Sequence, residues 1–574
     1  MPTPINALPL ALRIWSDDSS AKITVLSFYP DTPVITGIAV DSPSRVSVGS
    51  DGVGGTNDSS GAEPTGAPTG VAMFVWTFTA TGLASDSSYA FTATQLAGAE
   101  SGTVKTLPAT TDTENFTFFF VSCDGTAFGA DPATQDAGSD MGCYGYIRAT
   151  CSEKNVVSLI HTDDHGYVDG RRTSDSSFSD GSVRFNTVSP NTDQDIGAGV
   201  AYTEYAYAIA YGAYVGLIET VSGVTGSLDT RFLQEDRIWC HHNLPMIIGT
   251  GDHDIVNNLE ESAFTGQPMT AAWRNVAMNA YCNTIGAGQN YIDAAASPTK
   301  KHAAQINYLG PIEVITYDRV FAIDTVGTKI YDIAALTSIR ESDDTKRWLG
   351  TDQRDDILGA IDATSPFKVL AMSTGSYQMM SDADMAANRL LGWGVATLGA
   401  QQPLDRYTLT AAGGSEFQDI MTDIAAGGIA AKESSTYGPQ VVGLHGDTHR
   451  PYAYYHFYPR TASQSCLSMY EISSGTVNGQ PMQGLCDAIL DSTEYRGSHV
   501  LWIPDFTNRN FALSTSDNRN TCIQVDMSKS TGDWVMTVRV IECADESPIG
   551  TEIYSVEIKE NETSAPEYLR QGWL

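Results

Sequence analysis

Residues Val156–Asp169, with the sequence VVSLIHTDDHGYVD, contain the feature that most constrains the fold of this chain. The first part is a short apolar run rich in β-branched residues, which is typical of a strand buried inside a sheet. Two carboxylates, an imidazole and a phenol follow at once, between Asp163 and Tyr167. A simple polar turn would also contain Asp and Gly. Charged groups at the carboxyl end of a buried strand instead favour a ligand site at the edge of an α/β sheet.

The same pattern occurs three more times, each time as an apolar run followed directly by side chains that can bind metal ions. The runs are Phe116–Val121 before SCDG, Pro245–Ile248 before GTGDHD, and Val441–Leu444 before HGDTH. A sheet brings the ends of distant strands together. We therefore predict that the four segments meet at one site.

A site for two or more metal ions needs several anionic oxygens, one of them bridging, together with nitrogen or sulfur donors. The candidate ligands in the four segments are Cys123, Asp164, Tyr167, Asp252, Asp447 and His449. A phenolate such as that of Tyr167 is a hard ligand that favours a trivalent ion such as iron over magnesium. Clustered carboxylates repel one another and raise their own pKa values unless a cation is present, so the clustering itself predicts metal binding.

Taken in order, the segments SCDG, HTDDHGY, GTGDHDIVNN and LHGDTHR resemble four sequence blocks of the PhoD-like alkaline phosphatases. That family belongs to the calcineurin-like metallophosphoesterases and shares a tyrosine ligand with purple acid phosphatases. The intervening segments Ala271–Tyr281 and Arg347–Ile361 resemble two further parts of the family, and the resemblance extends over roughly Thr113–Val540. It implies an α/β (α+β) fold, a two-sheet sandwich flanked by helices, of the metallophosphoesterase type.

The resemblance also implies roles for the candidate ligands. Cys123, Asp164 and Tyr167 would bind an iron ion of the ferric type, with Asp164 bridging to a second ion. The metal ligands would be completed by Asp252, Asp447 and His449. The implied cofactors are two or more metal ions, Fe³⁺ together with Ca²⁺, although other divalent ions fit the same ligands.

The function that the resemblance implies is hydrolysis of phosphate monoesters, phosphodiesters or both by a metal-bridged hydroxide. His253 would lie beside the leaving group and donate a proton to it, and Asp254 would orient the imidazole of His253. A different class of function stays open. The chain could be a structural or attachment component of a virion tail or surface assembly that keeps the phosphatase scaffold with weak or no catalysis.

The sequence departs from the family pattern in three ways. The glycine that precedes the bridging aspartate in the family is Asp163 here. The family's block of two aspartates, a histidine and a glutamate is Gly251, Asp252, His253 and Asp254 here. The metal-binding histidine that many calcineurin-like enzymes place between the blocks has no obvious counterpart. The replaced glycine matters if that turn needs a positive φ, although Asp tolerates such a conformation better than most residues.

The first part of the chain, residues 1–110, predicts a separate all-β domain of the immunoglobulin or fibronectin kind. Arg13–Phe28 and Val71–Thr94 each contain two strand-like runs around a polar turn. Leu83 and Tyr89 resemble the tyrosine-corner signature of fibronectin type III sandwiches, a domain that the PhoD-like family has at this position. Residues 113–574 would form the phosphatase domain, with alternating runs in 499–560 as its C-terminal β hairpins.

Composition excludes some partners. The formal net charge is −35, from 33 basic and 68 acidic residues, which argues against nucleic acid and anionic membranes as partners. No stretch approaches the roughly 18 consecutive apolar residues of a membrane span. The apolar run Ile5–Trp15 lacks a preceding basic residue, so we predict no signal peptide. We favour an extracellular or particle-associated location, a small phosphate ester or phosphodiester as substrate, and assembly partners that bind through the N-terminal domain.

The chain contains nine cysteines without metal-type Cys-x-x-Cys pairs. Cys522 and Cys543 lie in adjacent strand-like segments and could form a disulfide in an oxidising compartment. The alternative is that most cysteines apart from Cys123 are small buried hydrophobic residues.

Overall fold

The fold is described here from a computed structural model, in which the strands and helices that surround the predicted site are defined. The structure describes the following residues: 5–7, 10–48, 73–96, 98–124, 142–165, 208, 211–212, 214–221, 235–251, 254, 278–292, 303–317, 351–361, 365–372, 440–446, 451–458, 467–475, 494–495, 498–502, 520–530, 532–543 and 548–560. Among these residues, no helix combines the length and apolar character needed to cross a lipid bilayer.

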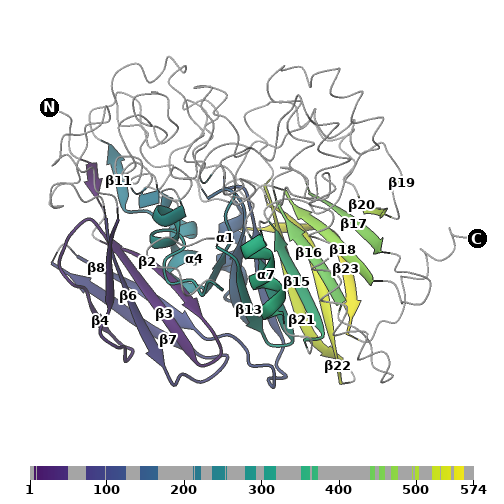
Figure 1. Cartoon of the computed structure of the whole chain (residues 1–574), viewed down its shortest axis with the longest axis horizontal. Helices are drawn as coiled ribbons and strands as arrows, with labels where there is room; N and C mark the ends of the chain where they lie inside the picture. The colour runs from purple at the N-terminus through teal and green to yellow at the C-terminus, as the bar shows by residue number, and fades with distance from the viewer. Residues whose placement is uncertain are drawn as a thin grey trace, which may run out of the picture.

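The first region of the chain forms two small antiparallel sheets (Figure 1). One has four strands in the order β2-β3-β6-β5, and the other has three in the order β4-β7-β8. The strands are β2 (Ala11–Ser16), β3 (Ser20–Ser27), β4 (Val34–Thr36), β5 (Ser44–Val48), β6 (Met73–Thr81), β7 (Ser88–Gln95) and β8 (Gly98–Lys105). Their inward side chains, including Ile14, Ile23, Trp76 and Phe91, form one hydrophobic core.

The turn between β2 and β3 depends on Asp17. Its carboxylate Oδ1 accepts hydrogen bonds from the backbone N–H groups of Ser19, at 2.8 Å, and Ser20, at 2.5 Å. Such Asx-type turns compete well with extended structure. Asp17 therefore reverses the chain where the sequence predicted a Ser/Asp turn.

A six-stranded sheet follows, in the order β12-β10-β9-β21-β22-β23. Its strands are β9 (Phe116–Val121), β10 (Val156–His161), β12 (Met246–Ile248), β21 (Asn520–Ser530), β22 (Asp533–Cys543) and β23 (Gly550–Lys559). β12, β10 and β9 are parallel, whereas β21, β22 and β23 add antiparallel hairpins from the C-terminal part of the chain. Every described residue of β9 and β10 is buried, as expected for strands covered on both faces.

A second, eight-stranded sheet has the order β13-β14-β15-β16-β18-β17-β20-β19. Its strands are β13 (Gln305–Leu309), β14 (Ile312–Thr316), β15 (Phe367–Met372), β16 (Gln440–His445), β17 (Pro451–Tyr458), β18 (Leu467–Ser474), β19 (Glu494–Tyr495) and β20 (Ser498–Trp502). The central strands β14, β15, β16 and β18 run parallel to one another. A separate pair joins β1 (Ile5–Ala7) to β11 (Ile218–Val221).

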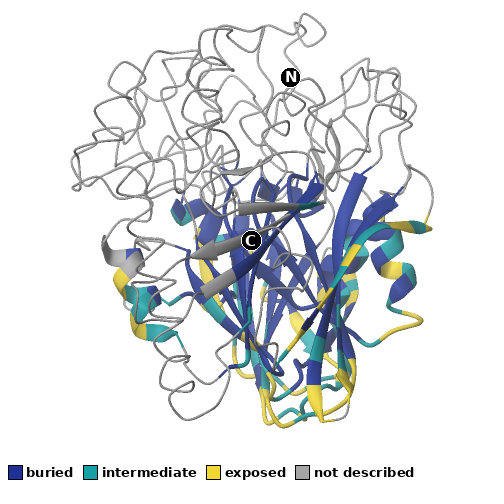
Figure 2. Ribbon diagram, turned by 90° about the vertical axis from the view of Figure 1, so that its right-hand side faces the viewer, coloured by how far each residue is buried: buried dark blue, intermediate teal, exposed yellow. Residues whose placement is uncertain are grey.

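The two large sheets share one hydrophobic core. Phe118, Phe120 and Ile160 of the six-stranded sheet belong to the same buried cluster as Val369 and Val442 of the eight-stranded sheet. In Figure 2 the buried strands occupy the middle of the molecule. The mixed α/β character predicted from the sequence is confirmed, with few helices among the described residues. The division at residues 110–113 stays a prediction.

Three described helices flank the sheets: α1 (Gly142–Thr150), α4 (Glu235–Asn243) and α7 (Thr351–Ala360). α1 packs on β21, β22 and β23, and α4 lies between α1 and the N-terminal strands β2 and β8. α4 has Glu235 and Asp236 in its first turn, where negative charge complements the positive end of the helix dipole. Pro245, two residues after the helix, prevents its continuation.

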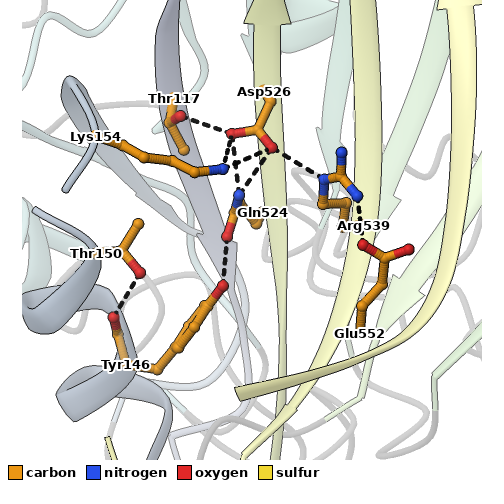
Figure 3. Close-up of polar contacts among 8 residues, drawn as sticks. All are labelled: Thr117, Tyr146, Thr150, Lys154, Gln524, Asp526, Arg539 and Glu552. Atoms are coloured by element: carbon orange, nitrogen blue, oxygen red, sulfur yellow. Dashed lines mark hydrogen bonds and ion pairs between the residues drawn. The ribbon is translucent and has the colours of Figure 1, made fainter. Parts of the chain in front are cut away.

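A polar network fixes the outer face of the six-stranded sheet (Figure 3). The carboxylate of Asp526 accepts hydrogen bonds from Thr117 at 2.7 Å, Lys154 at 3.0 Å and Arg539 at 3.0 Å. Burial opposes ionisation of Asp526, but these donors outweigh burial and lower its pKa. From α1, the hydroxyl of Tyr146 donates to Gln524 Oε1 at 2.7 Å, so the helix is attached to β21 by a directed contact.

Side chains of β2 connect the N-terminal sheets to the rest of the chain. The Leu12 N–H donates to Nε2 of His242 at 3.2 Å, and Trp15 Nε1–H donates to Asn307 Oδ1 at 3.0 Å. Arg13, which is 1% exposed, donates a hydrogen bond from Nη1 to Met246 Sδ. The Nε2 atom of His242 can accept this hydrogen bond from Leu12 only while the imidazole is neutral, because both ring nitrogens are donors in the protonated form. The contact therefore depends on pH.

We expect acid to weaken the His242 contact. Burial lowers the pKa of His242 from 6.5 to about 4, and the charge of Arg13 adds to the shift. The unfolded chain therefore binds the proton more readily, and stability falls as pH decreases from 6.5 to about 4, by up to about 3 kcal/mol for this group. Chemical denaturation at several pH values should show a smaller loss in His242→Gln than in the wild type. The same slope in both proteins would contradict this assignment, because the other buried histidines are common to both.

Candidate metal centre

Three of the four predicted segments leave the six-stranded sheet side by side. β10 lies between β9 and β12 in parallel register, with His161 opposite Val121 on one side and Ile248 on the other. Backbone hydrogen bonds continue past the strand ends, from Gly249 N–H to His161 O at 2.9 Å and from Asp124 N–H to Asp164 O at 3.0 Å. The segments that follow the three strands therefore begin at the same edge of the sheet.

The fourth segment arrives from the eight-stranded sheet. Gly446, directly after β16, is so close to its neighbours that a Cβ atom there would lie 2.1 Å from Ser122 Oγ and 3.0 Å from Asp163 Oδ2. Ser122 Oγ is also 2.7 Å from Ser474 Oγ at the end of β18. Thr162 Oγ1–H donates to the carbonyl of Met372, the last residue of β15, at 2.8 Å. The carboxyl ends of both sheets thus meet around Ser122 and Asp163.

Metal-binding side chains gather at this meeting point. One potential ligand atom each from Cys123, Asp163 and Asp164 lies within 4.8 Å of the others, and all three residues are buried. Cys123 Sγ is 3.0 Å from Asp163 Oδ2. Buried carboxylates close to a thiol are costly as anions unless positive charge compensates them. This donor set fits a metal ion.

An unusual backbone conformation aims these side chains inward. The φ angles are 53° at Cys123, 70° at Asp163 and 29° at Asp164, all in the left-handed region that non-glycine residues rarely adopt. Such strain persists when the surrounding structure imposes it, and it concentrates at functional sites. Asp163, which replaces a glycine in the family pattern that the sequence resembles, has the positive φ that a glycine would permit.

A hydrogen-bonded pair of His165 and Asp254 lies beside the cluster. His165 Nδ1 is 2.9 Å from Asp254 Oδ2, and the same carboxylate accepts the N–H of His165 at 2.6 Å and of Gly251 at 2.9 Å. Tyr211 donates its hydroxyl to the carbonyl of Asp254 at 2.5 Å. The pair therefore joins the segment after β10 to the segment after β12.

Burial keeps the imidazoles at this edge neutral. Desolvation lowers the pKa of His165 and of His161 well below the ordinary value, and the charge of Arg13 lowers both further. The two rings are in contact, with centroids 3.9 Å apart and planes tilted by 37°. Since Nδ1 of His165 faces a carboxylate, the neutral ring carries its proton there and leaves Nε2 as a lone-pair acceptor.

Asp124, the residue after Cys123, has a structural role. Its carboxylate lies 3.5 Å from Arg237 Nη1 and accepts the hydroxyl of Tyr144 at 3.2 Å, with both charged side chains fully buried. Burial raises the pKa of Asp124, and the charge of Arg237 opposes that rise. The pair attaches the segment after β9 to α1 and α4, which fixes the backbone that presents Cys123.

The structure therefore describes some of the predicted site residues and not others. Cys123 and Asp164 lie together in the donor cluster, and Asp254 lies beside it with His165 and Gly251 as partners. The predicted residues outside the described part of the chain are Tyr167, Asp252, His253, Asp447 and His449. The individual roles of all eight residues stay predictions, including the orientation of His253 by Asp254.

Two residues have a more specific place in the structure than the sequence indicates. The sequence pattern includes Asp163 and His165 among the polar side chains after the strand but does not assign either of them to the metal ligands. In the structure the carboxylate of Asp163 lies beside Cys123, and His165 is hydrogen-bonded to Asp254. The signal for Asp163 was present in the sequence, because a second carboxylate beside a predicted bridging aspartate can serve the same cation.

Comparisons with known proteins find structural but no sequence relatives. Neither a search of protein families nor a search of curated proteins gives a match. The solved structure of PhoD aligns with a TM-score of 0.54 and 13% sequence identity, covering 98% of this chain and 92% of that chain. Purple acid phosphatase PPD1 from yellow lupin (Lupinus luteus) seeds aligns with a TM-score of 0.51 and 10% identity, covering 97% and 75%.

At these identities the likeness establishes the fold alone. The chain shares its fold with PhoD and with the purple acid phosphatase, and the fold that the sequence resemblance implies is confirmed at this level.

A substitution at Gly251 tests how closely this residue packs against Asp164. A Cβ atom there would lie 2.1 Å from Asp164 N and 2.4 Å from Asp164 Oδ1. We expect Gly251→Ala to lower the free energy of unfolding by roughly 1–3 kcal/mol and to reduce bound metal, because the segment after β10 must move.

The matched control for Gly251→Ala is Gly359→Ala in α7. Nothing lies within 4 Å of the added methyl group at Gly359, and alanine is the better helix former by about 1 kcal/mol. Denaturant titration and metal analysis of both variants measure the difference. If Gly251→Ala and Gly359→Ala had the same free energy of unfolding and the same metal content, the close packing of Gly251 against Asp164 would be contradicted.

Proposed function

We propose that this protein is a metal-dependent phosphoesterase that hydrolyses phosphate monoesters, phosphodiesters or both. The observation that carries the proposal is the buried cluster of Cys123, Asp163 and Asp164 at the carboxyl ends of two packed sheets. The same fold is found in PhoD and in a purple acid phosphatase. Several anionic donors at this edge match the requirements of a site for two or more cations.

The proposed cofactors are Fe³⁺ and Ca²⁺. Cys123, Asp163 and Asp164 would hold the metal, with Tyr167, Asp252, Asp447 and His449 as the further proposed ligands. The thiolate of Cys123 and the phenolate of Tyr167 suit a trivalent iron, whereas carboxylates also suit calcium. When bound, such ions lower the pKa of a coordinated water and neutralise charge on the phosphoryl oxygens.

The side chains around the cluster would position the reacting groups. The Asp254 carboxylate keeps His165 and Gly251 together and so maintains the spacing between the segments after β10 and β12. Full burial of Asp163 and His165 excludes bulk water from the inner side of the site, which strengthens electrostatic interactions there. We propose His253, two residues after Gly251, as the group that donates a proton to the departing alkoxide.

We also propose that residues 1–110 form a fibronectin or immunoglobulin-like domain. If β2 to β8 are taken as strands A to G, the sheets have the order A-B-E-D and C-F-G, which is that of an immunoglobulin constant-type sandwich. The hydroxyl of Tyr89, at the start of β7, accepts the N–H of Ala84 at 2.8 Å, as in a tyrosine corner. Residues 113–574 would form the phosphatase domain, and an extracellular or particle-associated location belongs to the same proposal.

Asp164 provides the direct test of the function. We expect Asp164→Asn to reduce bound iron and the hydrolysis of a chromogenic phosphomonoester and phosphodiester by at least tenfold, because the bridging carboxylate is lost. The matched control is Asp526→Asn on the outer face of the sheet, which breaks the network in Figure 3 and costs stability. Its metal content per folded molecule should remain that of the wild type. A wild-type protein that binds metal but hydrolyses neither substrate would refute the enzymatic proposal.

Variants of Asp163 test whether this residue is a metal ligand or only a turn residue. Asp163→Gly relieves the positive φ but removes a carboxylate from the cluster. We expect metal affinity to fall at least tenfold while the stability of the metal-free protein is unchanged or higher. Isothermal titration of metal into Asp163→Gly and Asp163→Asn measures the affinity, and denaturant titration of the metal-free variants measures the stability. Asn is included because it keeps the side-chain shape without the charge. Unchanged affinity in both variants would assign Asp163 to the turn alone.

A further inference from the structure

A second group of metal-binding side chains lies apart from the proposed phosphoesterase site. Cys143 of α1, Cys522 of β21 and Cys543 of β22 place their sulfur atoms within 4.8 Å of one another, and all three residues are fully buried. None of the three forms a disulfide. Cys143 and Cys543 are 400 positions apart in the sequence (543 − 143), so only the packing of α1 on the C-terminal hairpin brings them together.

The strand register argues against a disulfide between the two strand cysteines. Cys522 is opposite Ile541, and Cys543 is opposite Asn520, so the two cysteines are diagonal neighbours on one face of the sheet. Diagonal residues of an antiparallel pair are about 7–8 Å apart, whereas disulfides usually join Cα atoms roughly 4.4–6.8 Å apart. The disulfide predicted as one possibility from the sequence is therefore disfavoured by geometry.

The same spacing suits a metal ion. Three thiolates bound to one zinc ion at about 2.3 Å have sulfur atoms about 4 Å from one another, which is within the separation found here. A metal can join sulfur atoms that are too far apart to bond directly. Cys143 is the second residue of α1, where the backbone N–H groups and the helix dipole favour a thiolate.

The surrounding structure holds the three cysteines rigidly. Tyr146, one turn after Cys143, donates to Gln524, two residues after Cys522 on the same face of β21 (Figure 3). The ring of Tyr146 also packs edge-on against Phe119 of β9, with centroids 6.0 Å apart. The helix and the strand that carry the thiols are thus held by a directed contact next to the thiols, which is how a preorganised ligand set is maintained.

We propose that Cys143, Cys522 and Cys543 form a structural site for a thiophilic divalent metal ion, zinc or cadmium. Three thiolates carry a charge of −3, so a divalent ion leaves a smaller buried charge than a monovalent one such as Cu(I). Thiolates select soft ions and discriminate against calcium and magnesium. The site would therefore bind a different ion from the one at the carboxylate cluster, and its role would be to join α1 to the C-terminal hairpin.

X-ray absorption spectroscopy of the zinc-loaded wild-type protein tests the site without any mutation. We expect a shell of about three sulfur atoms at roughly 2.3 Å from zinc. The carboxylate cluster offers a single sulfur atom, that of Cys123, so it cannot give this signal. A zinc shell of oxygen and nitrogen only, or a disulfide among the three cysteines in a peptide map made without reduction, would overturn the proposal.

Variants give a second, independent test. Cadmium titration followed by thiolate-to-metal absorption should show at least tenfold weaker binding in Cys143→Ser and in Cys543→Ser than in the wild type. The control is Cys151→Ser, at the end of the same helix but outside the cluster. Because phosphoesterase activity is not the readout, failure of this test leaves the proposed function unaffected. Equal cadmium binding in all four proteins would overturn the proposal.

Discussion

Parallel pairing of β10 with β9 on one side and β12 on the other is the constraint on which the candidate site depends. The pairing is enforced by burial, because every described side chain of β9 and β10 is packed on one face or the other. A slip of one residue would turn Phe118 and Phe120 away from the core that the two large sheets share. The register that satisfies the core also places Cys123 and Asp164 at the same edge.

The carboxylates of Asp124 and Asp254 at this edge contact protein groups rather than solvent. The charge of Arg237 compensates that of Asp124, whereas the neutral imidazole of His165 forms a hydrogen bond with the Asp254 carboxylate and does not compensate its charge. Asp163 and Asp164 lie among these groups, buried in a protein whose overall charge is strongly negative. A cation at the cluster would compensate both the local and the overall excess, which is why donor chemistry and burial lead to the same interpretation.

The sequence was informative where metal-binding side chains directly follow an apolar run. Phe116–Val121 and Val156–His161 are strands as predicted, and their polar ends lie together. The sequence could not reveal the contact of His165 with Asp254, because two residues on different strand ends meet only once the strand order is known. The same holds for Cys143, whose distance from Cys522 depends on how α1 packs on β21. Local patterns thus identify strands and reactive side chains, whereas long-range pairing selects which of them become neighbours.

The buried position of Arg13 has a consequence for how such a chain can be divided. Its guanidinium lies over the ring of Tyr214 at 5.7 Å and reaches Met246, both of which belong to the other side of the predicted domain boundary. Removing the first region would leave those partners facing water, together with the imidazole that now accepts the Leu12 N–H. The N-terminal sheets therefore bury side chains of the region that follows them. A recombinant in which another β-sandwich replaced these sheets would need an arginine at the position equivalent to Arg13.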